Sequence, residues 1–94
     1  MTRSHFVEAL LAKYGHLPIE REEFPTGALW LDLTLNEKQS LAIEITPRDS
    51  VGVSLNTLGD GRGFDAHDAT FEDFGLALAY IERQAVAHGK QSST

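Results

Sequence analysis

The sequence has no cysteine, few basic residues and no long apolar run. Without cysteine, disulfide scaffolds and Cys-ligated zinc or iron–sulfur sites are excluded. The longest apolar run near the N-terminus, Ala9–Ala12, is far shorter than the ~20 residues that a membrane-spanning helix needs. It is also too short for the core of a signal peptide. We therefore expect no membrane segment and a cytoplasmic location.

Basic residues are also few. Eight Lys and Arg stand against 14 Asp and Glu, which gives a formal net charge of −6 on 94 residues. The basic residues are scattered singly, so the chain has no basic stripe that could neutralise the phosphates of nucleic acid. We expect no direct nucleic-acid binding. A partner that associates through charge should instead be basic.

The length and the 41% share of hydrophobic residues predict one compact domain over residues 1–90. Residues 91–94 are expected to form a polar disordered tail. Two segments have helical periodicity, Met1–Gly15 and Phe74–His88. Thr2 or Ser4 is the predicted N-cap of the first helix and Gly15 its left-handed stop, while Asp73 or Thr70 should cap the second. The expected apolar stripes are Phe6, Val7, Leu10, Leu11 and Tyr14, and Phe74, Ala77, Leu78, Ile81 and Ala85.

Between the helices, three segments alternate apolar and polar residues: Ala28–Leu35, Leu41–Thr46 and Val51–Asn56. A period of two indicates half-buried antiparallel strands. Short polar turns at Asn36–Ser40 and Pro47–Ser50 join them, and His16–Pro25 offers a further short edge strand. The sequence therefore predicts an α+β two-layer sandwich, in which an antiparallel β-meander of three to four strands carries both helices on one face.

The glycine-rich stretch Asn56–Glu72 offers three kinds of site, each only half matched. Gly61, Gly63 and Ala66 loosely fit a dinucleotide fingerprint, but no helix follows directly. Residues 60–65 half-match a calcium-binding repeat that has no second copy. Asp65, His67 and Asp68 could form a metal or acid–base centre, but a zinc site needs further donors. We interpret the stretch as a crossover whose partner-binding candidates are Asp60, Asp65 and Asp68, and we expect no metal, no cofactor and no catalytic residue.

The strand face turned away from the helices holds the leading candidates, Trp30, Asp32, Thr34, Glu44 and Ser54. If the turn at Asn36–Ser40 has five residues, Asp32 lies opposite Glu44. The same register places Thr34 opposite Ala42 and Trp30 opposite Thr46. Two carboxylates directly opposite each other destabilise a sheet. A Lys or Arg of a partner would relieve that repulsion, and an exposed Trp is a frequent interface anchor.

These observations predict a small acidic binding protein that inhibits or neutralises a basic protein partner. The partner would be a toxin, as for an immunity protein or antitoxin, or a nucleic-acid-binding protein targeted by a phage-borne inhibitor. The alternative is a small structural or regulatory subunit that forms a homodimer or larger oligomer through the open sheet face or an edge strand. A metal-binding or hydrolytic protein that uses residues 59–68 is the third hypothesis.

Overall fold

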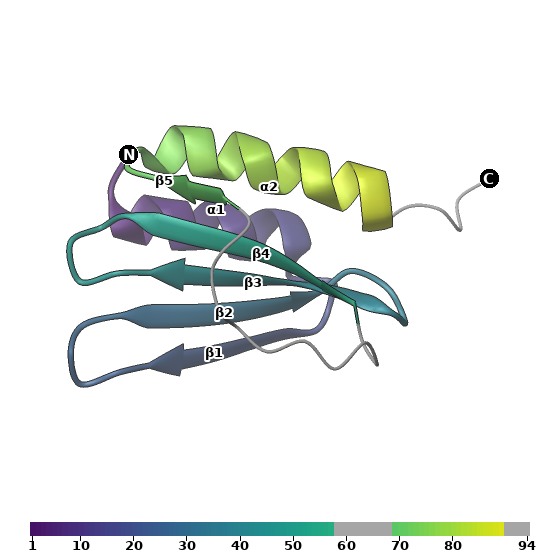
Figure 1. Ribbon diagram of the computed structural model, residues 1–94, viewed down its shortest axis with the longest axis horizontal. Helices are drawn as coiled ribbons and strands as arrows, with labels where there is room; N and C mark the ends of the chain where they lie inside the picture. Colours follow the sequence, from purple (N-terminus) through teal and green to yellow (C-terminus); the bar gives the residue numbers. More distant parts are fainter. Residues whose placement is uncertain (58–68, 90–94) are drawn as a thin grey trace.

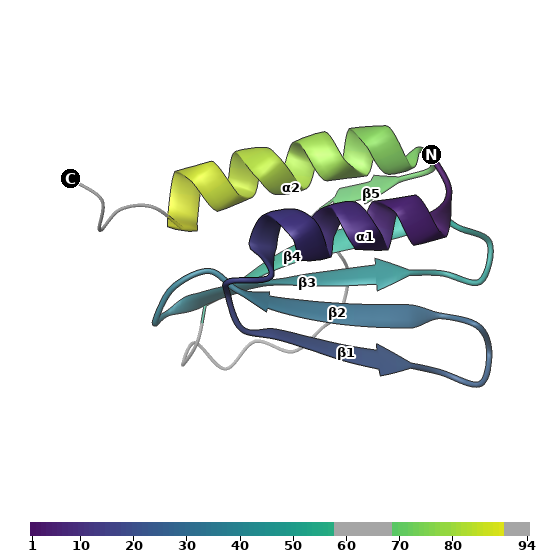
Figure 2. The same ribbon diagram turned by 180° about the vertical axis from the view of Figure 1, so that it is seen from behind.

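The computed structural model describes residues 1–57 and 69–89. The elements are α1 (Arg3–Tyr14), β1 (Ile19–Glu23), β2 (Leu29–Thr34), β3 (Gln39–Ile45), β4 (Val51–Thr57), β5 (Ala69–Phe71) and α2 (Phe74–Gly89). The strands form one antiparallel sheet in the order β1-β2-β3-β4-β5. Both helices lie on the same side of this sheet (Figures 1 and 2). The predicted α+β class and the helix positions are confirmed.

The core lies between the helices and the apolar face of the sheet. The predicted apolar face of the strands is confirmed, because Leu31, Ile43 and Val53 are buried beside the apolar stripes of the two helices. The opposite face of β3 and β4 is less open than predicted, because Ala42 and Ser54 are buried as well. The helices meet where the Phe6 and Phe74 rings pack with centroids 5.1 Å apart. Leu11 departs from the predicted stripe and is 39% exposed. No helix of the described residues has the length and apolar character to cross a membrane.

The helix ends follow their capping residues. Thr2, rather than Ser4, caps α1, and its side chain accepts a hydrogen bond from the His5 N–H at 3.2 Å. The predicted left-handed stop at Gly15 is wrong: Gly15 has φ −64°, and the helix ends as the Leu17 N–H bonds the Tyr14 carbonyl. Asp73 caps α2, because its Oδ1 accepts from the N–H groups of two first-turn residues.

The β2–β3 connection is tighter than the predicted five-residue turn. The Leu35 N–H bonds the Gln39 carbonyl, and the Asn36 side chain accepts from the N–H groups of Lys38 and Gln39. This Asx-type turn starts β3 at Gln39, two residues earlier than predicted. The predicted register is therefore wrong: Asp32 lies opposite Ala42, Trp30 opposite Glu44, and Thr34 opposite Ser40.

The β3–β4 turn is fixed partly by its own residues and partly by α1. The Asp49 N–H bonds the Thr46 carbonyl, which confirms the predicted turn around Pro47, and Asp49 has φ 65°. Arg3 donates to Asp49 Oδ1 at 3.0 Å, to the Thr46 carbonyl at 2.8 Å and to the Gly27 carbonyl at 2.7 Å. One guanidinium thus connects the start of α1 to the β1–β2 and β3–β4 turns.

The sheet has more strands than predicted. The edge strand considered within His16–Pro25 is present as β1, and its residues 20–23 are exposed. β5 lies in the stretch expected to be a loop and pairs with β4 through Phe71 opposite Val51 and Thr70 opposite Gly52. Three residues are too few to show a periodicity, so only the partly buried Phe71 marked this strand.

Candidate functional site

The face of the sheet that points away from the helices is the candidate site, and we call it the outer face. Its positions alternate along each strand with the buried core positions. The register arranges them in three rows that run across the strands. The rows are Glu22–Trp30–Glu44–Gly52–Thr70, Glu20–Asp32–Ala42–Ser54 and Thr34–Ser40–Asn56.

Trp30 has a carboxylate residue opposite it on both neighbouring strands. Glu22 of β1 and Glu44 of β3 are its direct cross-strand partners. Directly opposite residues have their Cβ atoms about 4.5–5.5 Å apart, so both acidic side chains are within reach of the indole ring. Trp30 is half-buried and is the only tryptophan of the chain. The strand therefore presents one large aromatic side chain in an acidic row.

Asp32, in the next row, lies directly opposite Glu20. Its Oδ1 is shielded from solvent and has no hydrogen-bond partner in the described structure. Burial and the nearby Glu20 carboxylate raise the pKa of Asp32 above its usual value, while a hydrogen bond with the Ser40 side chain acts in the opposite direction. The charged form of Asp32 is thus destabilised here, and a cation placed beside it would favour that form.

The structure brings together a different set of carboxylates from the predicted one. Asp32 and Glu44 share the outer face but lie in adjacent rows, because the tight β2–β3 turn shifts their pairing. The like-charge pair is instead Glu20 with Asp32, and Glu22 joins Glu44 around Trp30. Sequence reasoning missed Glu20 and Glu22. Their alternation with Ile19 and Arg21 was the available signal, but their positions on the outer face depend on pairing with Asp32 and Trp30 of another strand.

The remaining predicted residues have different outcomes. Thr34 is half-buried on the outer face. Ser54 also faces outward and is 4% exposed, and its contact with a partner stays a prediction. Its cross-strand neighbour on this face, Ala42, is also buried. Asp60, Asp65 and Asp68 lie outside the described residues. The dinucleotide, calcium and metal hypotheses also concern that part of the chain. Within residues 1–57 and 69–89, no cluster of His, Asp and Glu could hold a metal ion.

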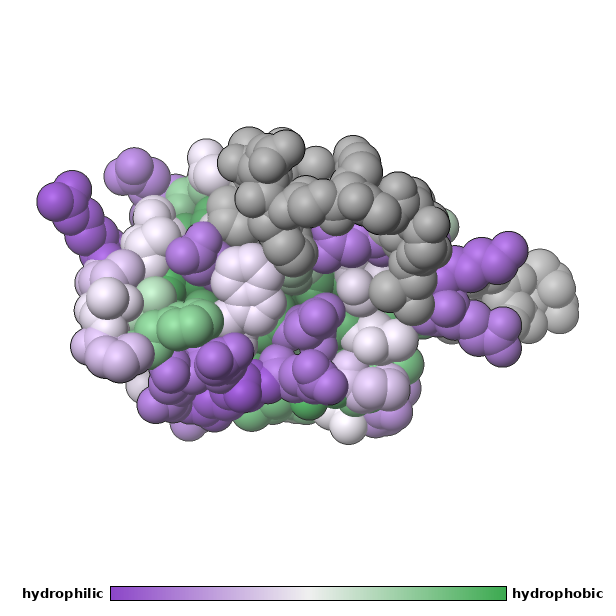
Figure 3. Space-filling model, turned by 60° about the horizontal axis from the view of Figure 1, so that its bottom comes forward, coloured by the Kyte–Doolittle hydropathy of each residue, from purple (hydrophilic) through white to green (hydrophobic). Residues whose placement is uncertain are grey.

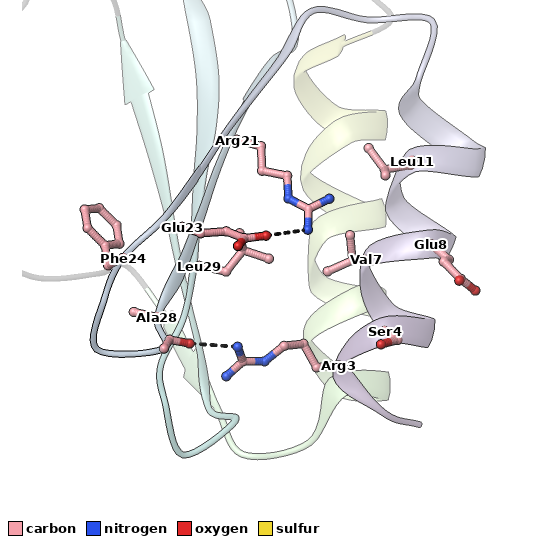
Figure 4. Close-up of a pocket in the computed structure, with 11 residues that line it drawn as sticks. Arg3, Ser4, Val7, Glu8, Leu11, Arg21, Glu23, Phe24, Ala28 and Leu29 are labelled. Atoms are coloured by element: carbon pink, nitrogen blue, oxygen red, sulfur yellow. Dashed lines mark hydrogen bonds and ion pairs between the residues drawn. The ribbon is translucent and has the colours of Figure 1, made fainter.

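A groove of about 380 Å³ lies on the opposite side of β1, between this strand and α1. Figure 4 shows the Arg21 and Glu23 side chains pointing from β1 into the groove, where they form an ion pair at 2.8 Å. Val7 and Leu11 line it from α1. The groove therefore combines an apolar wall with a charged strand, and it opens beside the edge of the sheet.

The outer face combines several acidic side chains with one large aromatic side chain. Four carboxylates occupy the outer face with Trp30, and the described positions of that face contain no Lys or Arg. Figure 3, which brings the β1 side of the molecule forward, shows hydrophilic side chains gathered there. A guanidinium or ammonium group can pair with the carboxylates and lie against the indole face, a contact worth ~0.5–2 kcal/mol.

Comparison with known proteins gives no further information on the site. No family model, no curated protein and no solved structure matches this chain.

Proposed function

We propose that this chain is a small acidic binding protein that neutralises or inhibits a basic protein partner through its outer face. One observation carries the proposal: Trp30 lies between Glu22 and Glu44, with the Glu20–Asp32 pair in the next row. Like charges placed opposite each other reduce the stability of the free sheet. A bound Lys or Arg offsets that repulsion, so the same residues that destabilise the free protein favour the complex.

The energetics follow from the kind of residues present. Trp is among the side chains whose truncation most weakens interfaces, by ~2 kcal/mol or more at a hot spot. The partly desolvated Asp32 carboxylate discriminates in favour of a cationic side chain, and the net charge of −6 raises the rate of encounter with a basic surface. An acidic face of this type competes with phosphates for the basic surface of a nucleic-acid-binding protein. It can equally cover the basic surface of a toxin.

The test compares what three immobilised forms retain from a cell extract, followed by titration with the purified partner. The first is the wild type, the second is Trp30→Ala, and the third combines Asp32→Asn with Glu44→Gln. A matched control combines Glu37→Gln with Glu72→Gln, which removes the same two charges from exposed positions outside the outer face. We expect a basic partner whose Kd rises by about tenfold to thirtyfold in both outer-face variants.

The control variant should change the Kd by less than about twofold in buffer at 0.15 M salt, where distant charges are screened. Equal weakening by the control and by the outer-face double variant would show that only net charge matters, and the proposal would be wrong. A partner that is not basic, or one bound equally well by Trp30→Ala, would also contradict it.

A second candidate function is a small structural or regulatory subunit that associates through α2. It is favoured by Leu76 and Val86, which are 62% and 70% exposed. Val86 also lines a shallow depression with Ala79 and Ala87. Sedimentation velocity decides between the two: a dimer that Val86→Glu converts to a monomer supports the subunit, whereas a monomeric wild type excludes self-association as its function.

A further inference from the structure

β1 is the outermost strand of the described sheet, and its hydrogen-bonding groups alternate in direction. The Phe24 N–H bonds the Ala28 carbonyl, and the Pro18 carbonyl accepts from the Thr34 N–H. In an antiparallel ladder, bonded residues recur at every second position, so Glu20 and Glu22 also bond to β2. The N–H and C=O groups of Ile19, Arg21 and Glu23 therefore point away from β2, at the edge of the sheet.

The side chains of the same strand point to two different surfaces. Glu20 and Glu22 lie on the outer face, opposite Asp32 and Trp30. Arg21 and Glu23 point into the groove beside α1, whose far wall contains Val7 and the 39% exposed Leu11 (Figure 4). A strand added to this edge would lie about 4.8 Å beyond β1, with alternate side chains over the acidic outer face and over the groove.

A second copy of this chain is a poor occupant of the edge. Antiparallel pairing of two β1 strands about a two-fold axis keeps Glu20 and Glu22 of both copies on the same face. The register centred on Arg21 sets Glu20 opposite Glu22 twice, and also sets Arg21 opposite Arg21. Registers centred on Glu20 or on Glu22 set that glutamate opposite itself. Each arrangement places like charges in direct cross-strand contact, which destabilises the pairing.

We infer that the β1 edge accepts an extended segment of the basic partner as a sixth strand, with its Lys or Arg residues facing Glu20 and Glu22. The intervening apolar residues of that segment face the groove, toward Leu11 and the alkyl stem of Arg21. Main-chain bonds to Ile19, Arg21 and Glu23 hold the strand, and the two faces select its alternating sequence. This inference rests on the proposed function, because it assigns the mode in which the acidic outer face engages its partner.

The probe is a capped seven-residue peptide of alternating Lys and Val, which favours an extended conformation. Its binding is followed through the fluorescence of Trp30, the only tryptophan, and through hydrogen exchange of single amides. Two substitutions at one position separate backbone from side chain. Arg21→Pro removes an N–H that points out of the sheet, a change that an edge strand tolerates. Arg21→Ala lacks the same side chain but keeps that N–H, so it is the reference for the proline variant.

We expect the peptide to bind Arg21→Pro about tenfold more weakly than Arg21→Ala, because the proline removes one hydrogen bond and obstructs the edge. In the wild type, bound peptide should slow exchange of the amides of Ile19, Arg21 and Glu23. A peptide N-methylated at its valine amides should lose affinity for the wild type, and this arm does not depend on the folding of the proline variant. An alternating Glu and Val peptide should not bind.

The possible failures are distinct. If the Lys and Val peptide quenches or shifts Trp30 fluorescence but binds both Arg21 variants equally and protects none of the three amides, strand addition is wrong and the proposed outer-face function stands. If the peptide does not bind the wild type, or binds no better than its Glu and Val counterpart, both the inference and the proposed function are contradicted.

Discussion

Replacing Asp32 by Asn should stabilise the free protein at neutral pH. Burial, followed by the Glu20 carboxylate, raises the pKa of Asp32 in the folded state. The folded chain thus binds this proton more tightly than the unfolded chain does. The contribution of Asp32 to stability is complete below its ordinary value of 3.8 and is lost as the pH rises through its folded-state pKa. At pH 7 the charged side chain is therefore a net cost, and Asn removes it while retaining an acceptor for Ser40.

A lower bound on the effect follows from the cross-strand pair. Directly opposite like charges cost ~0.2–1 kcal/mol and burial adds to this cost, so Asp32→Asn should raise the free energy of unfolding by at least that amount at pH 7. For a domain of this size this bound corresponds to a rise of about 1–8 °C in the melting temperature. Thermal and urea unfolding, followed by circular dichroism at pH 7 and at pH 3, measure it. At pH 3 the gain should vanish, because Asp32 is protonated in both states.

Glu20→Gln is the matched control, since it removes only the neighbouring charge. Burial is the larger cause of the raised pKa of Asp32, so this control should recover less stability than Asp32→Asn does. A loss of stability in Asp32→Asn at pH 7 would refute the reasoning. An equal gain at both pH values would also refute it, because packing rather than charge would then be the cause.

Two further substitutions test the packing and the connection between α1 and the turns. Phe6→Ala should destabilise the fold by ~3–5 kcal/mol in urea unfolding, because the ring is fully buried against Phe74, whereas Leu76→Ala at a 62% exposed position should change stability by less than ~0.5 kcal/mol. Similar losses for the two would contradict the assigned core. Arg3→Ala should cost ~1–3 kcal/mol, because it removes charge-assisted bonds to Gly27, Thr46 and Asp49. Arg3→Lys should recover less than half of that loss, because an ammonium cannot donate in the geometry of the guanidinium.

The sequence was sufficient to predict the layers and the core because both depend on periodicity. Alternation over residues 29–35, 41–46 and 51–56 assigns each side chain to a face, whatever the register between strands. Register depends instead on turn geometry, and the Asn36 side chain shortens the β2–β3 turn in a way that alternation does not reveal. β5 escaped prediction because three residues next to a glycine-rich stretch show no period.

The candidate site was predictable only within the strands that the periodicity identified. Trp30, Asp32 and Glu44 were placed on the correct face. Glu20 and Glu22 were not, because the outer face extends onto β1 only through pairing with β2, and the isolated segment holds a single apolar residue, Ile19. The burial of Ser54 was also unpredictable, since alternation assigns a side chain to a face but does not give its exposure.

The order of the strands in the sheet has a consequence for how the chain folds. Every strand pairs with its neighbour in sequence, so the hairpin loops β1–β2, β2–β3 and β3–β4 are short and the entropy lost in closing each is small. The contacts made by the helices are long-range instead. Arg3 of α1 hydrogen-bonds residues 43 and 46 positions away, and the ring of Phe6 packs against that of Phe74 of α2. Such nonlocal contacts raise the contact order, and a higher contact order slows folding. During synthesis α1 is made first, but its apolar stripe is covered only when the meander is complete and α2 has been made.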